Sequence, residues 1–327
     1  MKVLITGAGG FIGSHLVDSQ LEQGYDVRGI DLHLDLLSHQ AAHSHLEAIC
    51  GDLTEKDLLP KLVEGMEIVY HLASAHLDVS LPDDRYRRVN VNATLALLEA
   101  AKEAGVKRFV HCSSVGVIGD VRRPPADETT ECRPVNIYER TKLEGERVAL
   151  DFFRRTGFPV VVVRPAWVYG PRCPRTAKLL RTISKGRFMI FGSGKNMRHP
   201  VYITDAIRGF ELCAETPDIE GEIFIIAGTM PVESRELVSV ISQQLNIRTR
   251  KISLPIFLGQ MAGLALEMTF GLAGQQPPFS RRSMDFFLKH NAYSINKAQS
   301  RLNYQPQVDL STGIQKTIQS IRASQTD

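Results

Sequence analysis

Three side chains in the middle of the chain are of the types that move a proton at a carbon–oxygen bond. Tyr138 and Lys142 lie four residues apart in a helical pattern, so their side chains are expected on one face, one turn apart. The pKa of a phenol is about 10, but a neighbouring ammonium group stabilises the phenolate and lowers that pKa. Ser114 follows a buried strand, and its hydroxyl could hold a substrate oxygen. Because the same spacing fits an ordinary exposed helix face, the Tyr and Lys pair needs support from the rest of the chain.

A glycine-rich loop near the N-terminus could bind the phosphates of a dinucleotide. Gly7, Gly10 and Gly13 stand between the first β-branched run and the first helical pattern. Glycines here allow a sharp turn, a close approach of a pyrophosphate and tight packing of the helix on the sheet, and the helix N-terminus stabilises the phosphate charge. The spacing therefore predicts a dinucleotide-binding loop.

Asp31 ends the second expected strand, 24 residues after Gly7. A carboxylate there can accept hydrogen bonds from the adenosine ribose hydroxyls and repels a 2′-phosphate, which favours NAD over NADP. The alternative for Asp31 is a solvated turn aspartate. Asp52 and Leu53 follow a short third strand at residues 48–50, where they can reach the adenine edge.

The order of the elements explains how these residues can meet. Short β-branched runs alternate with longer helical patterns that end at glycine. We expect strands at residues 3–5, 26–30, 67–70, 108–111 and 160–163, and helices at 11–23, 84–104 and 136–155. The alternation predicts an α/β fold with a doubly wound parallel Rossmann sheet, in which ligands bind at the carboxyl ends of the strands.

The pattern changes after residue 170, which predicts a second lobe. We expect a helix at 178–186, short strands at 188–191 and 201–203, a helix at 205–215, a strand at 221–227 that returns to the main sheet, and mainly helices beyond Pro255. The expected division is a dinucleotide-binding Rossmann domain over 1–170, rejoined by about 204–250, and a smaller, mostly helical substrate-binding lobe over 171–203 and 251–327.

Composition excludes several other classes of protein. Hydrophobic residues make up 43% of the 327 residues and charged residues 23%, which is usual for a globular chain and excludes disorder and coiled coil. A net charge of +3 predicts no attraction to nucleic acid or to anionic membranes. The apolar stretch at 256–272 contains Gln260 and Glu267, so we expect a core-packed helix there and no integral membrane segment.

Cysteine and histidine usage argues against a metal site. The five cysteines are scattered without a C-x-x-C pair, which predicts neither a disulfide framework nor zinc and favours a cytoplasmic location. The first apolar run ends at Thr6, too soon for a secretion signal. A polar surface loop is expected around the four histidines, which lack a regular spacing with carboxylates or cysteines: His33, His39, His43 and His45.

Taken together, these motifs resemble the extended short-chain dehydrogenase/reductase family, part of the NAD-dependent epimerase/dehydratase superfamily. The resemblance rests on T-G-x-x-G-x-x-G from Thr6, the serines after the fifth strand, Y-x-x-x-K from Tyr138, and the segments at 71–74, 89–94 and 168–171. It covers nearly the whole chain. Ser114, Tyr138 and Lys142 would then form a catalytic triad, in which Tyr138 transfers the proton and Lys142 also binds the nicotinamide ribose.

The resemblance also implies NAD as the cofactor and a set of residues that bind it. These are Gly7, Gly10, Phe11, Ile12, Gly13, Asp31, Asp52, Leu53, Ala73, Ser74, Tyr138, Lys142 and Pro165.

Within the family, the chain is more similar to the 3β-hydroxysteroid dehydrogenase-like group than to the nucleotide-sugar enzymes. Trp167 stands where the sugar enzymes usually carry an Asn, and an indole favours an apolar substrate wall. Arg164-Pro165 and the C-terminal segments resemble the steroid-type group. Arg198 lies in a segment whose arginine binds a diphosphate in sugar enzymes, although non-sugar members share it.

The expected activity is therefore interconversion of a secondary alcohol and a ketone by hydride transfer with NAD, on a small-molecule substrate near Ser114, Trp167 and Arg198. The alternative is a nucleotide-sugar epimerase or dehydratase that uses tightly bound NAD. A third possibility, a dinucleotide sensor without catalysis, is disfavoured by the intact Ser114, Tyr138 and Lys142. The helices at 84–104 and 136–155 resemble those that form a four-helix interface in related proteins, so we expect a homodimer.

Overall fold

The computed structural model describes residues 1–76, 81–186, 188–247, 253–272 and 284–323. Its centre is a seven-stranded sheet in which every neighbouring pair is parallel. In spatial order the strands are β3 (Leu46–Cys50), β2 (Asp26–Asp31), β1 (Lys2–Thr6), β4 (Ile68–His71), β5 (Arg108–Cys112), β6 (Val160–Pro165) and β11 (Ile223–Ile226). The order reverses between β1 and β4, as the doubly wound prediction requires, and the predicted return of a late strand to the sheet is confirmed.

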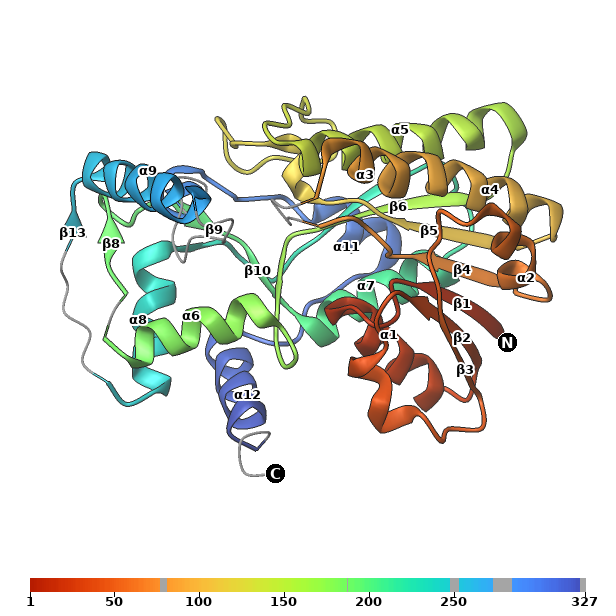
Figure 1. Cartoon of the computed structure of the whole chain (residues 1–327), viewed down its shortest axis with the longest axis horizontal. Coiled ribbons are helices and arrows are strands. Elements are labelled where there is room, and N and C mark those ends of the chain that lie inside the picture. Colours follow the sequence, from red (N-terminus) through yellow and green to blue (C-terminus); the bar gives the residue numbers. More distant parts are fainter. Residues whose placement is uncertain (77–80, 187, 248–252, 273–283, 324–327) are drawn as a thin grey trace.

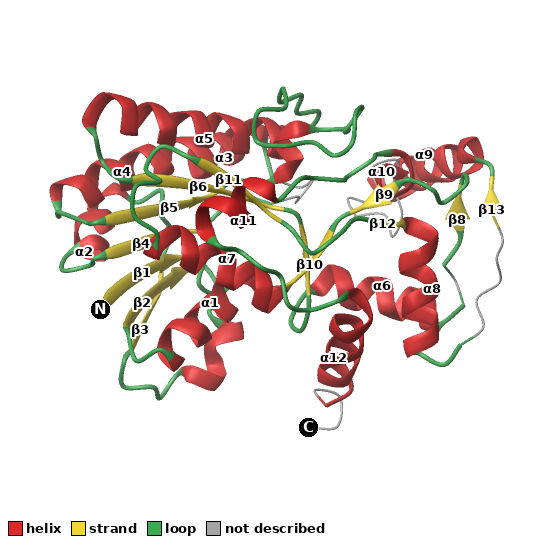
Figure 2. Cartoon of the chain, turned by 180° about the vertical axis from the view of Figure 1, so that it is seen from behind, coloured by secondary structure: helices red, strands yellow, loops and turns green. Residues whose placement is uncertain are grey.

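Helices cover both faces of this sheet, as Figures 1 and 2 show. α1 (Phe11–Glu22) and α7 (Ile203–Glu215) contact each other on one face; α2 (Leu59–Val63), α4 (Ala93–Glu103) and α5 (Ile137–Thr156) pack together on the other. Successive residues of β1 divide between the two cores, because Val3 and Ile5 pack with α1 while Leu4 packs with α2 and α4. Apolar residues on both sides of each strand are what a parallel sheet buried on two faces requires.

The helix expected at 84–104 is divided into three parts. α3 (Asp83–Arg87) leads into a π-helical turn, η3 (Arg88–Asn92), before α4 begins. The turn places Asn90, which is buried, where its side chain hydrogen-bonds to both backbone polar groups of Ala75 and to Thr141 on α5. Gly145 lets α5 pass close to this turn, since a Cβ there would lie 2.2 Å from the Asn90 carbonyl oxygen. The extent of the expected helix is therefore confirmed, and the π-helical turn within it is the feature that the sequence pattern did not indicate.

The second lobe is assembled from short pieces that follow β7 (Trp167–Tyr169). They are α6 (Pro174–Ser184), β8 (Ile190–Phe191), β9 (Met197–Arg198), β10 (Pro200–Tyr202), β12 (Val232–Glu233), α8 (Ser234–Gln244), β13 (Ser253–Leu254), α9 (Ile256–Leu272), α10 (Asp285–Leu288) and α12 (Leu310–Ala323). α11 (Asn296–Leu302) packs instead against β11 of the seven-stranded sheet. The described residues also form short 3-10 helices: η1 (Asp35–Gln40), η2 (Lys56–Leu58) and η4 (Val115–Ile118). α8 packs against α6 and α12, so this helix lies with the second lobe, although the proposed division groups residues 204–250 with the Rossmann domain.

α9 departs from the core-packed helix expected at 256–272. Six of its large apolar side chains are exposed: Ile256, Phe257, Leu258, Met261, Leu264 and Met268. Among the described residues, no helix is long and apolar enough to cross a membrane. The expectation of a core-packed helix is therefore wrong, because most of the apolar surface of α9 faces outward.

Candidate active site

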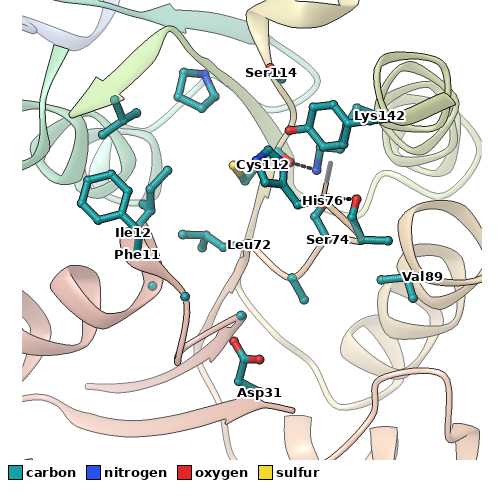
Figure 3. Close-up of a pocket in the computed structure, with 18 of the residues that line it drawn as sticks. Phe11, Ile12, Asp31, Leu72, Ser74, His76, Val89, Cys112, Ser114 and Lys142 are labelled. Atoms are coloured by element: carbon teal, nitrogen blue, oxygen red, sulfur yellow. Dashed lines mark hydrogen bonds between the residues drawn. The ribbon is translucent and has the colours of Figure 1, made fainter. Parts of the chain in front are cut away.

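A cavity of about 950 Å³ lies at the carboxyl ends of the parallel strands, the edge where doubly wound folds bind ligands. Asp31 lies at one end of it and Ser114 and Lys142 at the other, as Figure 3 shows. The predicted cofactor residues all line this cavity: Gly7, Gly10, Phe11, Ile12, Gly13, Asp31, Asp52, Leu53, Ala73, Ser74, Tyr138, Lys142 and Pro165. Ser114 and Trp167 line it as well, whereas Arg198 does not.

The glycine loop has the geometry that a bound pyrophosphate requires. Gly7 has a φ of +73°, and a Cβ on it would lie 2.7 Å from the backbone nitrogen of Ala73. A Cβ on Gly13 would lie 1.9 Å from the Gly7 carbonyl oxygen, so only glycine allows α1 to begin this close to the loop. Gly10 is the N-cap of α1, and the one atom near a Cβ built on it is the Gly7 carbonyl oxygen, at 3.1 Å. The loop therefore leaves its cavity side open beside a helix N-terminus, where phosphate charge is stabilised.

The far end of the cavity carries the two predicted adenosine-binding carboxylates. One oxygen of Asp31 accepts a hydrogen bond from the backbone N–H of Leu32 at 2.7 Å. Burial raises the pKa of the Asp31 carboxyl, while its backbone hydrogen bonds act in the opposite direction. Asp52 forms an ion pair with Arg85 at 2.6 Å and accepts hydrogen bonds from Thr54. This pairing fixes the orientation of Asp52 at the cavity wall.

α5 presents Tyr138 and Lys142 to the other end of the cavity. The helix begins with a capping box, in which the Asn136 side chain accepts from the Glu139 N–H and the Glu139 carboxylate accepts from the Asn136 N–H. One turn into the helix, Lys142 is 3% exposed, and its Nζ donates to the Cys112 carbonyl oxygen at the end of β5. The cap therefore sets the rotation of the first turns, which carry both side chains.

The electrostatics of Tyr138 differ from the expectation. Burial raises the pKa of Tyr138 to about 12, and the influences that lower it are the Arg175 cation and a hydrogen bond with Ser114. The pKa of Lys142 is itself lowered by burial. The expectation that the ammonium group brings the phenol toward neutrality is therefore wrong for the cofactor-free chain, because Lys142 is engaged with a backbone carbonyl and burial dominates.

The two serines after β5 have different surroundings. Ser113 is 2% exposed, and its Oγ donates to Glu146 at 2.6 Å. Glu146 in turn forms a buried ion pair with Arg164 of β6. Ser114 lines the cavity, and its Oγ accepts from the Gly116 N–H at the start of η4. Ser113 therefore holds α5 to the sheet, and Ser114 is the serine that can meet a substrate.

Two cavity residues were missed by the sequence analysis. The ring of His76 contacts the ring of Tyr138 edge to face, with centroids 4.7 Å apart. Arg175 lies in the first turn of α6 and brings a cation to the same region. Neither residue belongs to a periodic pattern or a spaced motif. Only the fold brings them to the cavity.

Arg198 lies outside the cavity lining. Its guanidinium group stacks on the ring of Phe286 at 4.7 Å, and burial lowers its pKa to about 10. The predicted contact between Arg198 and a substrate in this cavity stays a prediction.

Comparison with known proteins identifies the family. The NAD dependent epimerase/dehydratase family matches residues 3–227, which include all of the seven-stranded sheet except the first residue of β1. The chain belongs to this family. NAD is therefore its cofactor, and the residues around the glycine loop and Asp31 line the cavity at the carboxyl ends of the strands.

Relatives within this family carry out different reactions. The chain is 28% identical to the mouse (Mus musculus) decarboxylating sterol-4-alpha-carboxylate 3-dehydrogenase, with 100% of this chain and 92% of the relative aligned. It is 32% identical to the UDP-glucose 4-epimerase of Mycolicibacterium smegmatis, over 98% of this chain and 99% of the relative. The crystal structure of the UDP-glucuronic acid 4-epimerase of Bacillus cereus, in complex with UDP-glucuronic acid and NAD, superposes with a TM-score of 0.80 at 28% identity, covering 99% and 100% of the two chains. Family membership alone therefore leaves the reaction open between dehydrogenase, epimerase and dehydratase.

Proposed function

We propose that this protein is an NAD-dependent dehydrogenase/reductase that interconverts a secondary alcohol and a ketone on an apolar substrate. The observation that carries the proposal is the meeting of Ser114, Tyr138 and Lys142 at one end of a cavity that also has Trp167 in its wall. A Ser and a Tyr that line the same cavity beside a buried ammonium group are suited to proton transfer at a carbon–oxygen bond.

The chain's own residues would hold the reacting oxygen and move one proton. Ser114 Oγ and Tyr138 Oη, which face the same cavity, would both contact the substrate oxygen. With a pKa raised to about 12, Tyr138 is protonated at neutral pH and ready to donate to the oxygen of a ketone. In the reverse direction the phenolate would accept the proton of the alcohol, and the positive charge of Arg175 would stabilise that phenolate.

NAD supplies the hydride acceptor or donor when it is bound. Gly7, Gly10 and Gly13 would hold its pyrophosphate, and Asp31 its adenosine ribose. Lys142 Nζ, which donates to the Cys112 carbonyl, is placed to turn toward a ribose hydroxyl in the same cavity. These residues leave the triad end of the cavity for the substrate.

An apolar substrate is favoured by the wall beside the triad. Trp167 lies next to Tyr169, with ring centroids 5.9 Å apart, and Leu72, Val168 and Pro174 add apolar surface to the cavity. An indole offers a broad apolar face and a single N–H donor, which suits a hydrocarbon skeleton better than the hydroxyls of a sugar. Arg175, in the first turn of α6, would then face the polar end of such a substrate.

The second candidate is a nucleotide-sugar epimerase, favoured by the 32% identity to a UDP-glucose 4-epimerase along almost the whole of both chains. The two candidates differ in net redox change, because an epimerase returns the hydride within one turnover. The experiment is to incubate the protein with added NAD and either a panel of secondary alcohols, including hydroxysteroids, or UDP- and dTDP-sugars. We expect NADH absorbance to accumulate with an alcohol in proportion to the ketone formed. Configurational change of a sugar nucleotide, with no NADH from any alcohol, would refute the dehydrogenase proposal.

A further inference from the structure

α9 has the reverse of the side-chain distribution expected for a helix at the surface of a soluble domain. Its inward positions are small: Gly259 and Gly263 are buried, and a Cβ on Gly259 would lie 2.5 Å from the Met284 sulfur. Its outward positions are large and apolar, with Phe257 60%, Met261 63% and Met268 65% exposed. A surface helix normally turns its polar side to water, so this outward face requires a cover.

The apolar face of α9 is defined by six residues and lies at the end of the molecule remote from the seven-stranded sheet (Figures 1 and 2). Its members are Ile256, Phe257, Leu258, Met261, Leu264 and Met268. The face is anchored, because α9 packs through its glycine side on a small cluster of Phe191, Met284 and Phe287. Met189, which is 46% exposed, precedes β8, and β8 pairs with the strand directly before α9. The exposed apolar surface therefore belongs to a folded element and extends beyond the helix.

The charges in the sequence around α9 favour an anionic lipid surface as the cover. Glu267 is the only acidic residue between positions 248 and 282, whereas five basic residues flank the helix: Arg248, Arg250, Lys251, Arg281 and Arg282. These flanking residues lie outside the described part of the chain, and only their positive charge, which the sequence gives, supports the inference. The net charge of +3 for the whole chain conceals this local excess. Basic residues clustered beside an apolar segment that contacts a membrane are attracted to the headgroups of anionic lipids.

The length of α9 agrees with a position in the interface. Its 17 residues are fewer than the roughly 20 needed to span the hydrocarbon core, and no described helix meets the requirements for a span. We propose that α9 docks this protein on an anionic lipid bilayer, with the apolar face of α9 inserted among the headgroups and upper acyl chains. This inference is independent of the reaction catalysed.

The test is co-flotation of the full chain with vesicles of phosphatidylcholine, with and without phosphatidylglycerol. We expect binding to the vesicles that contain phosphatidylglycerol, weakened by high salt. The triple variant Phe257→Ser, Met261→Ser and Met268→Ser should have an affinity for these vesicles that is lower by at least about tenfold, because three inserted apolar groups are lost. Since all three side chains point outward, the variant should keep its thermal unfolding temperature and its NAD affinity, which shows that it folds.

A matched control replaces exposed apolar residues outside α9. Met230→Ser and Val135→Ser, at positions 66% and 58% exposed, should leave vesicle binding within about twofold of the unmodified chain. Equal binding by the triple variant and the unmodified chain would overturn the proposal, as would absence of flotation with both kinds of vesicle. The proposal would also be overturned if neither protein binds vesicles and light scattering shows a dimer for the unmodified chain but not for the triple variant. That result would assign the apolar face of α9 to contact with a second copy.

Discussion

Replacing the two neighbouring serines one at a time should separate stability from catalysis. Ser113→Ala removes a buried hydroxyl that donates to the Glu146 carboxylate at 2.6 Å. Ser114→Ala removes a hydroxyl that lines the cavity and accepts from the Gly116 N–H. Each variant serves as the control for the other, because the same atom is deleted from adjacent positions of the same strand end.

The expected losses follow from these surroundings. A buried hydrogen bond to a charged group contributes about 1.5–3 kcal/mol, so Ser113→Ala should lower the free energy of unfolding by about 2 kcal/mol. Glu146 keeps its ion pair with Arg164, which limits the loss. Ser114→Ala removes only the cap of η4, a loss of about 0.5–1 kcal/mol, but should reduce turnover by about 10²-fold if its hydroxyl holds the reacting oxygen.

The assays are urea unfolding and the initial rate of NADH formation with the alcohol that gives the fastest reaction. Ser113→Ala should keep most of its turnover below its unfolding midpoint, and Ser114→Ala should keep most of its stability. The reverse assignment, with turnover lost in Ser113→Ala and retained in Ser114→Ala, would refute our division of roles. So would equal losses of both quantities in both variants.

Three further results are expected. Calorimetry should show that the unmodified chain binds NAD more tightly than NADP. Asp31→Ala should reduce this difference in affinity, because it removes the negative charge that repels a 2′-phosphate. Tighter binding of NADP than of NAD by the unmodified chain would contradict this prediction. Burial lowers the pKa of His71 to about 3 and of His199 to about 4, so both stay neutral in the folded chain while the unfolded chain takes up protons below pH of about 6.5. Stability should therefore fall as pH falls, by about 4 kcal/mol from these two residues between pH 7 and pH 5, and a free energy of unfolding by urea that is unchanged over this range would contradict the assignment. Light scattering at micromolar concentration should give twice the mass of one chain, with α4 and α5 at the interface, and the mass of a single chain would exclude the homodimer.

The parallel sheet could be predicted because the signals for it are local. Runs such as residues 160–163 are apolar on both sides, and glycine follows each long helical pattern, so strand and helix could be assigned without knowing their neighbours. Ser114, Tyr138 and Lys142 could be placed together because the carboxyl ends of parallel strands share one edge. The structure confirms that all three line one cavity.

The remaining features depend on contacts between distant segments. The π-helical turn at Arg88–Asn92 forms where Asn90 bonds to Ala75 and Thr141 and where Gly145 allows a close approach, and none of these partners is visible in helical periodicity. His76 and Arg175 reach the cavity from separate segments. The raised pKa of Tyr138 results from burial, which residue spacing does not report.

The outward face of α9 could not be predicted for a related reason. A helix that is apolar on all sides is usually buried, and the hydrophobicity of residues 256–272 does not indicate which side would meet the protein. In the folded chain Gly259 and Gly263 are buried and Gly259 makes a close contact with Met284, so the large side chains point away. Residue size along the helix, read together with periodicity, was the signal available for this arrangement.

The proton transfer by Tyr138 is the central claim, and Tyr138→Phe tests it most directly. This variant keeps the ring that contacts His76 and removes only the phenolic hydroxyl at the triad end of the cavity. The measurement is net NADH formation from a secondary alcohol, made alongside calorimetric NAD affinity on the same preparation. We predict that NAD affinity is retained and that turnover falls by about 10²-fold or more. A Tyr138→Phe protein that binds NAD and keeps most of its turnover would show that the proton is transferred by another group.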